Sequence, residues 1–169
     1  MPNEPVIGPV ILNNTPLVAL WSIGQLVLLR DLYGEVFIPP TILEEFVAVE
    51  PEIRKADLAE APWIKIAPLA NPHQVLAYVG LDQGEAEVLA LASEQSARLV
   101  IIDERKGRRY AQRLGLPLSG TLGVLLTAKT QGLIQAVAPL IYQLKTEGLF
   151  LSPELIEKAI ELAGENTPN

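Results

Sequence analysis

The chain has 169 residues, of which 49% are hydrophobic and only 5% aromatic, so we expect a single domain with an aliphatic core. It contains no cysteine, which excludes a disulfide framework and a zinc–thiolate site. The formal net charge of −7 argues against a nucleic-acid contact by the chain as a whole, but six of the 13 basic residues fall between Arg98 and Arg113 and allow a local positive patch.

Hydropathy gives no sign of an export signal or a membrane anchor. The first ten residues, M-P-N-E-P-V-I-G-P-V, have neither a basic leading region nor a long apolar run. The most apolar long segment, residues 17–29, is interrupted by Ser22, Gly24 and Gln25 and is too short to span a bilayer. We therefore expect a cytoplasmic protein with no membrane partner.

Strands and helices are predicted to alternate in the first half of the chain. A strand over residues 9–13 precedes a helix over residues 16–32, because Thr15 suits the N-cap and Pro16 the first helical position. Residues 35–38 are a short β-branched and aromatic run, typical of a strand. The next expected elements are a helix from residue 40, a polar helix over about 52–60, an edge strand over 63–66, and a loop or short helix over 68–79.

The second half has clearer patterns. Residues 82–93 predict a helix, residues 99–102 an apolar strand, and residues 104–114 a basic helix. The expected elements after these are a brief strand over 116–118 and helices over 121–131, 136–147 and 153–163, of which the last two form a C-terminal helical pair. The alternation predicts one α/β domain over residues 1–169, with a core over about 9–150, a C-terminal helix over 152–164 and a central parallel sheet.

Four polar residues follow the predicted strands or lie near the start of a helix. Asn13 ends the first strand and Asp103 ends the strand over 99–102, while Glu85 and Glu45 lie in early turns of helices. Because the carboxyl ends of parallel strands converge on one crevice, we expect these side chains to meet there. Oxygen ligands without cysteine suit a hard cation such as Mg²⁺ or Mn²⁺.

Each of these residues also has a purely structural interpretation. Asp82 and Glu85 have the spacing of a capping box, and Glu45 can act on a helix dipole. Asp103 could cap the helix that follows it, and Asn13 could be a hydrogen-bonded turn residue. The residues alone leave both interpretations open.

Two further features suggest phosphate binding. Arg105, Arg109 and Arg113 share one face of the basic helix, either as a phosphate track or as a solvated face that pairs with acids. The turn Ser119-Gly120-Thr121 leads into a helix N-terminus, where backbone N–H groups can hold a phosphate oxygen.

Five sequence blocks, in this order along about residues 10–164, resemble the PIN domain family, in particular a stand-alone prokaryotic subfamily. The blocks are N-N-T-P-L-V-A-L, G-E-V-F-I-P-P-T-I-L-E-E-F, L-D-Q-G-E-A-E-V-L-A-L-A, L-V-I-I-D-E-R-K-G-R-R-Y-A and G-T-L-G-V-L-L. The resemblance implies a three-layer α/β/α fold and a metal-dependent nuclease that hydrolyses phosphodiesters, usually in RNA. It also implies that the chain is similar to the toxins of toxin–antitoxin pairs, with an antitoxin protein as a partner.

The resemblance also assigns roles to residues of this sequence. Glu45, Glu85 and Asp103 match the family's acids, and Thr15 and Thr121 match its small hydroxyl residues near the site. The first acidic position differs, because this chain has Asn13, which keeps a carbonyl oxygen but lacks the negative charge. The expected ligands of Mg²⁺ or Mn²⁺ are Asn13, Glu45, Glu85 and Asp103, and the expected substrate contacts are Thr15, Arg105, Arg109 and Thr121.

Two functions therefore remain open. The first is a metal-dependent ribonuclease that cleaves single-stranded RNA. The second is a catalytically weak or inactive PIN-like module that binds nucleic acid or protein, because Asn13 replaces the first acid. The apolar face of the last helix, which includes Leu155 and Leu162, is mostly expected in the core but could also form a homodimer interface.

Overall fold

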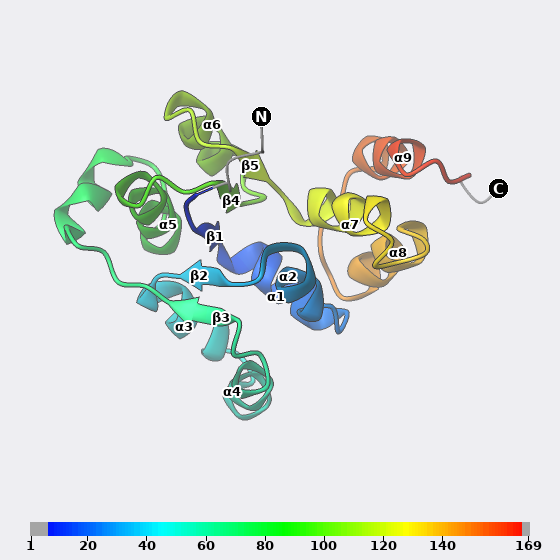
Figure 1. Ribbon diagram of the computed structural model, residues 1–169, viewed down its shortest axis with the longest axis horizontal. Coiled ribbons are helices and arrows are strands. Elements are labelled where there is room, and N and C mark those ends of the chain that lie inside the picture. The colour runs from blue at the N-terminus through cyan, green and yellow to red at the C-terminus, as the bar shows by residue number, and fades with distance from the viewer. Residues whose placement is uncertain (1–6, 167–169) are drawn as a thin grey trace.

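The computed structural model describes residues 7–166 and contains, within them, one five-stranded parallel sheet (Figure 1). The strand order is β3-β2-β1-β4-β5, so the first strand is central and β3 is an edge strand as predicted. The strands are β1 (Val10–Leu12), β2 (Val36–Ile38), β3 (Ile64–Ile66), β4 (Leu99–Ile101) and β5 (Leu118–Ser119). Every pairing is parallel, so the carboxyl ends of all strands share one edge, and the expected parallel sheet is confirmed.

Helices cover both faces of this sheet. In chain order they are α1 (Asn14–Ser22), α2 (Val27–Tyr33), α3 (Pro40–Val47), α4 (Pro51–Ala59), the 3₁₀ helix η1 (Pro72–Ala77), α5 (Gln83–Glu94), α6 (Arg105–Arg113), α7 (Thr121–Thr130), α8 (Ala138–Thr146) and α9 (Pro153–Leu162). Helix α5 packs on β1 and contacts α3 and α6, whereas α7 contacts α1, α2 and α9 (Figure 1). The expected three-layer α/β/α fold is confirmed. The expected domain over residues 1–169 extends past the described residues at both ends.

The core is aliphatic because the central strands are covered on both faces. All three residues of β1 are fully buried, as are Val100 and Ile101 of β4. Strands buried on both faces have continuous apolar sequences and no alternation, which is why V-I-L and L-V-I-I were recognisable as strands.

The single helix predicted over residues 16–32 is wrong. The structure has two helices there, α1 and α2, whose axes differ by 117°. The break includes Gly24, whose φ of +68° favours glycine, and the Gln25 N–H donates to the Leu20 carbonyl. The bend lets both helices bury their leucines, Leu17 and Leu20 on α1 and Leu28 and Leu29 on α2.

The described residues contain no single helix that is long and apolar enough to cross a membrane. Helices α1 and α2 reach that length and composition only as a pair, and the pair is sharply bent.

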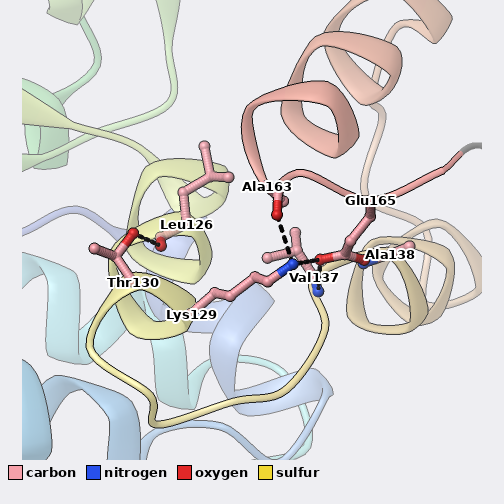
Figure 2. Close-up of polar contacts among 7 residues, drawn as sticks. All are labelled: Leu126, Lys129, Thr130, Val137, Ala138, Ala163 and Glu165. Atoms are coloured by element: carbon pink, nitrogen blue, oxygen red, sulfur yellow. Dashed lines mark hydrogen bonds and ion pairs between the residues drawn. The ribbon is translucent and has the colours of Figure 1, made fainter.

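Polar contacts of Ala163 and Glu165, which we call the clasp, hold the residues that follow α9 against α7 and α8 (Figure 2). The Glu165 carboxylate accepts hydrogen bonds from the backbone N–H groups of Val137 (2.7 Å) and Ala138 (2.9 Å), at the start of α8. Lys129 of α7 forms an ion pair with Glu165 at 2.8 Å and also donates to the Ala163 carbonyl. Only 14% of the Glu165 side chain is exposed, so this clasp is shielded from solvent.

Replacing Glu165 with Gln is expected to lower the free energy of unfolding at pH 7 by about 1–3 kcal/mol. Both carboxylate oxygens of Glu165 accept hydrogen bonds, and in Gln one of them becomes an NH₂ group, which would face N–H donors and could not accept from them. Burial acts to raise the pKa of Glu165, but the hydrogen bonds from Lys129, Val137 and Ala138 outweigh it, so the pKa lies below its ordinary value of 4.5. The stabilisation is therefore present above pH 4.5 and lost as the pH falls through the folded-state pKa. Urea unfolding at pH 7, and at a series of lower pH values until Glu165 is protonated in the folded chain, measures both effects.

Glu161→Gln is the matched control, since Glu161 is an exposed residue of α9. A Glu165→Gln variant as stable as this control at pH 7, or one whose deficit does not shrink as the pH is lowered, would contradict the role of the ionised clasp.

Candidate active site

Asn13 is a buried polar residue at the carboxyl end of β1. Its backbone N–H donates to the Ile101 carbonyl of β4 at 3.0 Å, which ties the ends of the two strands together. It occupies the N-cap position of α1 with extended backbone angles, but its side chain makes no capping hydrogen bond. The residue is only 3% exposed. A buried amide that is not used as a cap keeps its oxygen available for another partner.

Glu45 and Glu85 come together although 40 positions separate them in the chain. A Cβ atom at Gly84 would lie 2.5 Å from Oε1 of Glu45, so the carboxylate of α3 rests directly on the first turn of α5. Burial raises the pKa of Glu45, and the charges of Asp82 and Glu87 raise it further. Glycine at position 84 therefore allows the two helices to bring their acids close.

The Glu85 carboxyl is the most perturbed acid of this site. Burial raises its pKa to about 7, together with the charge of Asp82, a hydrogen bond between these two carboxyls, and the charges of Glu104 and Glu45. Asp82 is the N-cap of α5, since its Oδ1 accepts from the Glu85 N–H at 2.8 Å. Within residues 7–166 no bond returns from the Asp82 N–H to the Glu85 carboxylate, so a full capping box does not form. Glu85 thus faces other acids.

Glu104 is a site residue that the sequence interpretation missed. Its Oε1 accepts a hydrogen bond from Thr15 Oγ1 at 3.2 Å, and its charge raises the pKa of Glu85. It follows Asp103 directly, and the two consecutive acids after the strand in V-I-I-D-E-R were the signal that could have revealed it. We call Glu45, Asp82, Glu85 and Glu104 the acidic cluster.

Asp103 has a different set of neighbours. Its Oδ1 accepts from the Thr121 N–H at 2.8 Å and its Oδ2 accepts from Thr121 Oγ1 at 2.6 Å. It therefore caps α7 and not α6, the helix that directly follows it. Gly120 makes room, because a Cβ there would lie 2.6 Å from Oδ1. Both Asp103 oxygens are thus engaged with Thr121, and within residues 7–166 no three acids, Asp103 included, are grouped around one ion position.

The arginines of α6 differ in exposure and in the direction of their side chains. Arg105 and Arg109 are exposed on α6. Arg108 instead turns back toward β4, where its Nη1 donates to the Ile102 carbonyl at 2.9 Å, and it lines a groove together with Thr15, Asp103 and Glu104. Thr121 was expected to contact the substrate, and in the structure its hydroxyl donates to Asp103.

The donor chemistry of the acidic cluster fits a divalent cation, although its arrangement is not a closed coordination shell. In the part of the chain that the structure describes, no three Asp, Glu, His or Cys side chains are grouped so that one metal ion would contact all of them. Glu45 and Glu85 are half-buried, and Asp82 and Glu104 are exposed. Carboxylates that repel one another are stabilised by a nearby cation, and their oxygens are the ligands that Mg²⁺ and Mn²⁺ prefer.

The chain matches a known protein family. A family model described as a PIN domain matches residues 9–165. PIN domains are a nucleic-acid-binding, nuclease-like family whose members generally use divalent metals. No curated protein matches the chain. The match spans all five strands, the acidic cluster and the C-terminal clasp, and the chain therefore belongs to the PIN domain family.

Proposed function

We propose that this PIN domain is a metal-dependent ribonuclease that hydrolyses phosphodiester bonds in single-stranded RNA. The observation that carries the proposal is the acidic cluster, where the Glu45 carboxylate lies against the first turn of α5 and the charges of Asp82, Glu104 and Glu45 add to burial in raising the pKa of Glu85 to about 7. A position that holds several carboxylates against their mutual repulsion is more often functional than structural.

Glu45, Glu85 and Glu104 would hold Mg²⁺ or Mn²⁺, together with the Asn13 carbonyl oxygen and Asp103. A bound ion of this kind lowers the pKa of a water molecule and offsets the negative charge that develops on the phosphate. The chain's own residues orient the acids: Thr15 donates to Glu104 and Thr121 donates to Asp103. Arg105 and Arg109, exposed on α6, would hold the RNA backbone, and their contribution should weaken as salt concentration rises.

The wider biological assignment follows from the same resemblance to toxin ribonucleases. The domain would act in the cytoplasm of a prokaryotic cell as the toxin of a toxin–antitoxin pair, with an antitoxin protein as its partner. A homodimer is part of the same proposal. Ile156 and Ile160 of α9 are buried in the core, whereas Leu155 and Leu162 are 47% and 66% exposed and are not assigned to the dimer interface, because they line the groove beside the candidate site.

A second candidate function is favoured by two observations. Asn13 stands where the family has an acid, and within residues 7–166 no three metal-binding side chains are grouped around one point. Both fit a catalytically weak or inactive module that binds nucleic acid or protein through the same region.

Incubation of the purified chain with a labelled single-stranded RNA distinguishes the two functions. We expect cleavage with Mn²⁺ or Mg²⁺ and no cleavage with EDTA. A double-stranded RNA of the same sequence is the control and should resist. Binding of the RNA without cleavage in both metals would reject the ribonuclease and support the binding module.

A further inference from the structure

A groove of about 760 Å³ begins at the candidate active site and extends along α7 to α9. Thr15, Asp103 and Glu104 line one part of it. Its far wall is formed by α9 and by the residues that precede it, among them Phe150, Leu155 and Lys158. Figure 1 shows α9 alongside α7 at the right of the molecule, and the Glu165 clasp holds the residues that follow α9 against α7. The groove therefore adjoins the acidic cluster at Glu104, and the clasp stabilises the position of its far wall.

The groove has an apolar lining and an exposed aromatic ring. Leu122 and Leu126 of α7 face Leu155 and Leu162 of α9 across it. Phe150 lies between α8 and α9 and is 88% exposed, although burying a phenyl group is normally favourable. An aromatic ring left in water beside an apolar groove is suited to stacking on the flat face of a ligand, and nucleic-acid bases bind aromatic side chains in this way.

Two cations line the same groove. Arg108 of α6 and Lys158 of α9 reach it from different helices. Within residues 7–166 neither forms an ion pair, although the chain has an excess of acids. Arg108 is held in place by its hydrogen bond to the Ile102 carbonyl. Two unpaired cations beside an apolar wall complement a phosphate and a base, whereas the apolar face of a partner helix would leave both charges without a counterion.

We infer that this groove binds an unpaired nucleotide of the RNA next to the phosphate at the acidic cluster, with Phe150 as the stacking surface and Arg108 and Lys158 as contacts to the backbone. The inference rests on the proposed function for the identity of the ligand. It adds a subsite built largely by the C-terminal helix, and it requires that the bound RNA be single-stranded there, because only an unpaired base can turn its face to Phe150.

The test measures binding of a fluorescein-labelled single-stranded uridine decamer by fluorescence anisotropy, in EDTA so that cleavage does not interfere. Phe150→Ala is expected to weaken binding about tenfold. Lys158→Ala is expected to weaken it and to reduce the slope of log affinity against log salt by about 0.7. Both residues are exposed, so neither change should alter the melting temperature.

Tyr142→Ala and Lys145→Ala are the matched controls, because both residues are exposed on α8 and neither lines the groove. They should leave affinity within about twofold of the unmodified chain, well below the tenfold stacking effect. A decamer with 5-iodouridine at one position should form a photo-cross-link to Phe150 that is absent from Phe150→Ala.

The outcomes separate this inference from the ribonuclease proposal. Weaker RNA binding in Phe150→Ala and Lys158→Ala supports the subsite even if the chain cleaves nothing. RNA cleavage by the unmodified chain, with both variants behaving like their controls, overturns the subsite and leaves the ribonuclease standing. The subsite is also overturned if the unmodified chain does not bind the decamer. It is overturned as well if the unmodified chain binds a polypeptide and both variants lose that binding while their RNA affinity is unchanged.

Discussion

Glu85→Gln is expected to reduce Mn²⁺-dependent cleavage of single-stranded RNA by at least about 100-fold. Residues that only orient a metal ligand contribute about 10–100-fold to affinity or activity, so loss of a carboxylate that would itself hold the ion should exceed that range. The same variant should bind Mn²⁺ more weakly in calorimetric titration. Single-turnover cleavage assays at saturating protein would separate a loss of chemistry from a loss of RNA binding.

The metal-free Glu85→Gln protein should become more stable at high pH while it loses activity. The pKa of Glu85 is raised to about 7 in the folded chain from an ordinary value of 4.5, first by burial and then by Asp82, Glu104 and Glu45. Because the folded-state pKa lies above the unfolded value, stability falls as the pH rises from about 4.5 through 7. The substitution removes this penalty, so its melting temperature should exceed that of the unmodified chain at pH 8 and match it at pH 4.

Glu44→Gln is the control for both measurements, since Glu44 is the exposed neighbour of Glu45 on α3. It should change neither cleavage nor the pH dependence of melting. A Glu85→Gln protein that cleaves RNA at the unmodified rate would remove Glu85 from the reaction. If the melting temperature of Glu85→Gln at pH 8 is lower than that of the unmodified chain, the ionised Glu85 carboxylate stabilises the fold and is not destabilised by its acidic neighbours.

Asn13→Asp is expected to tighten Mn²⁺ binding about tenfold or more and to raise the rate of cleavage. The substitution restores the carboxylate that the resemblance assigns to this position, and it is nearly isosteric. The added charge lies at a residue that is 3% exposed, where electrostatic attraction to a cation is weakly screened. Isothermal titration with Mn²⁺, followed by the RNA cleavage assay, measures both effects.

The same variant should be less stable than the unmodified chain when metal is absent, because a buried carboxylate without a partner is unfavourable. Mn²⁺ should reverse the deficit. Asn14→Asp is the matched control, since it adds the same charge one residue later, on the first turn of α1, and should alter Mn²⁺ affinity much less. Equal effects of the two substitutions would mean that Asn13 adds only a general electrostatic field and does not contact the ion.

Local sequence was sufficient for most elements of this fold. The buried strands β1 and β4 were predictable because parallel strands covered on both faces need continuous apolar residues. The starts of α5 and α9 were predictable because Asp82 and Ser152 accept backbone hydrogen bonds from residues three positions later. The prediction failed at residues 16–32, since apolar periodicity continues through the turn and does not reveal a 117° change of direction.

The candidate site could be predicted only in part. The sequence identified Asn13 and Asp103 by their places at the ends of strands, and Glu45 and Glu85 by their places in early turns of helices. The structure brings Glu45 and Glu85 together, with Asp82 and Glu104 nearby. The metal-ligand roles of all these residues stay predictions. Sequence spacing could not show that Arg108, and not Arg105 or Arg109, lines the groove beside Asp103, because that depends on how α6 is rotated against β4.

The amino-acid sequence by itself determined the aliphatic core, the parallel sheet and three candidate acids, Glu45, Glu85 and Asp103, because burial patterns and helix caps depend on residues only a few positions apart. Only the tertiary structure decided which partner each acid has. Asp103 bonds to Thr121, 18 positions later, and Glu104 accepts from Thr15, 89 positions earlier. These contacts exist because β4 pairs with β1 on one side and β5 on the other, and that strand order brings the starts of α1, α6 and α7 to one edge of the sheet.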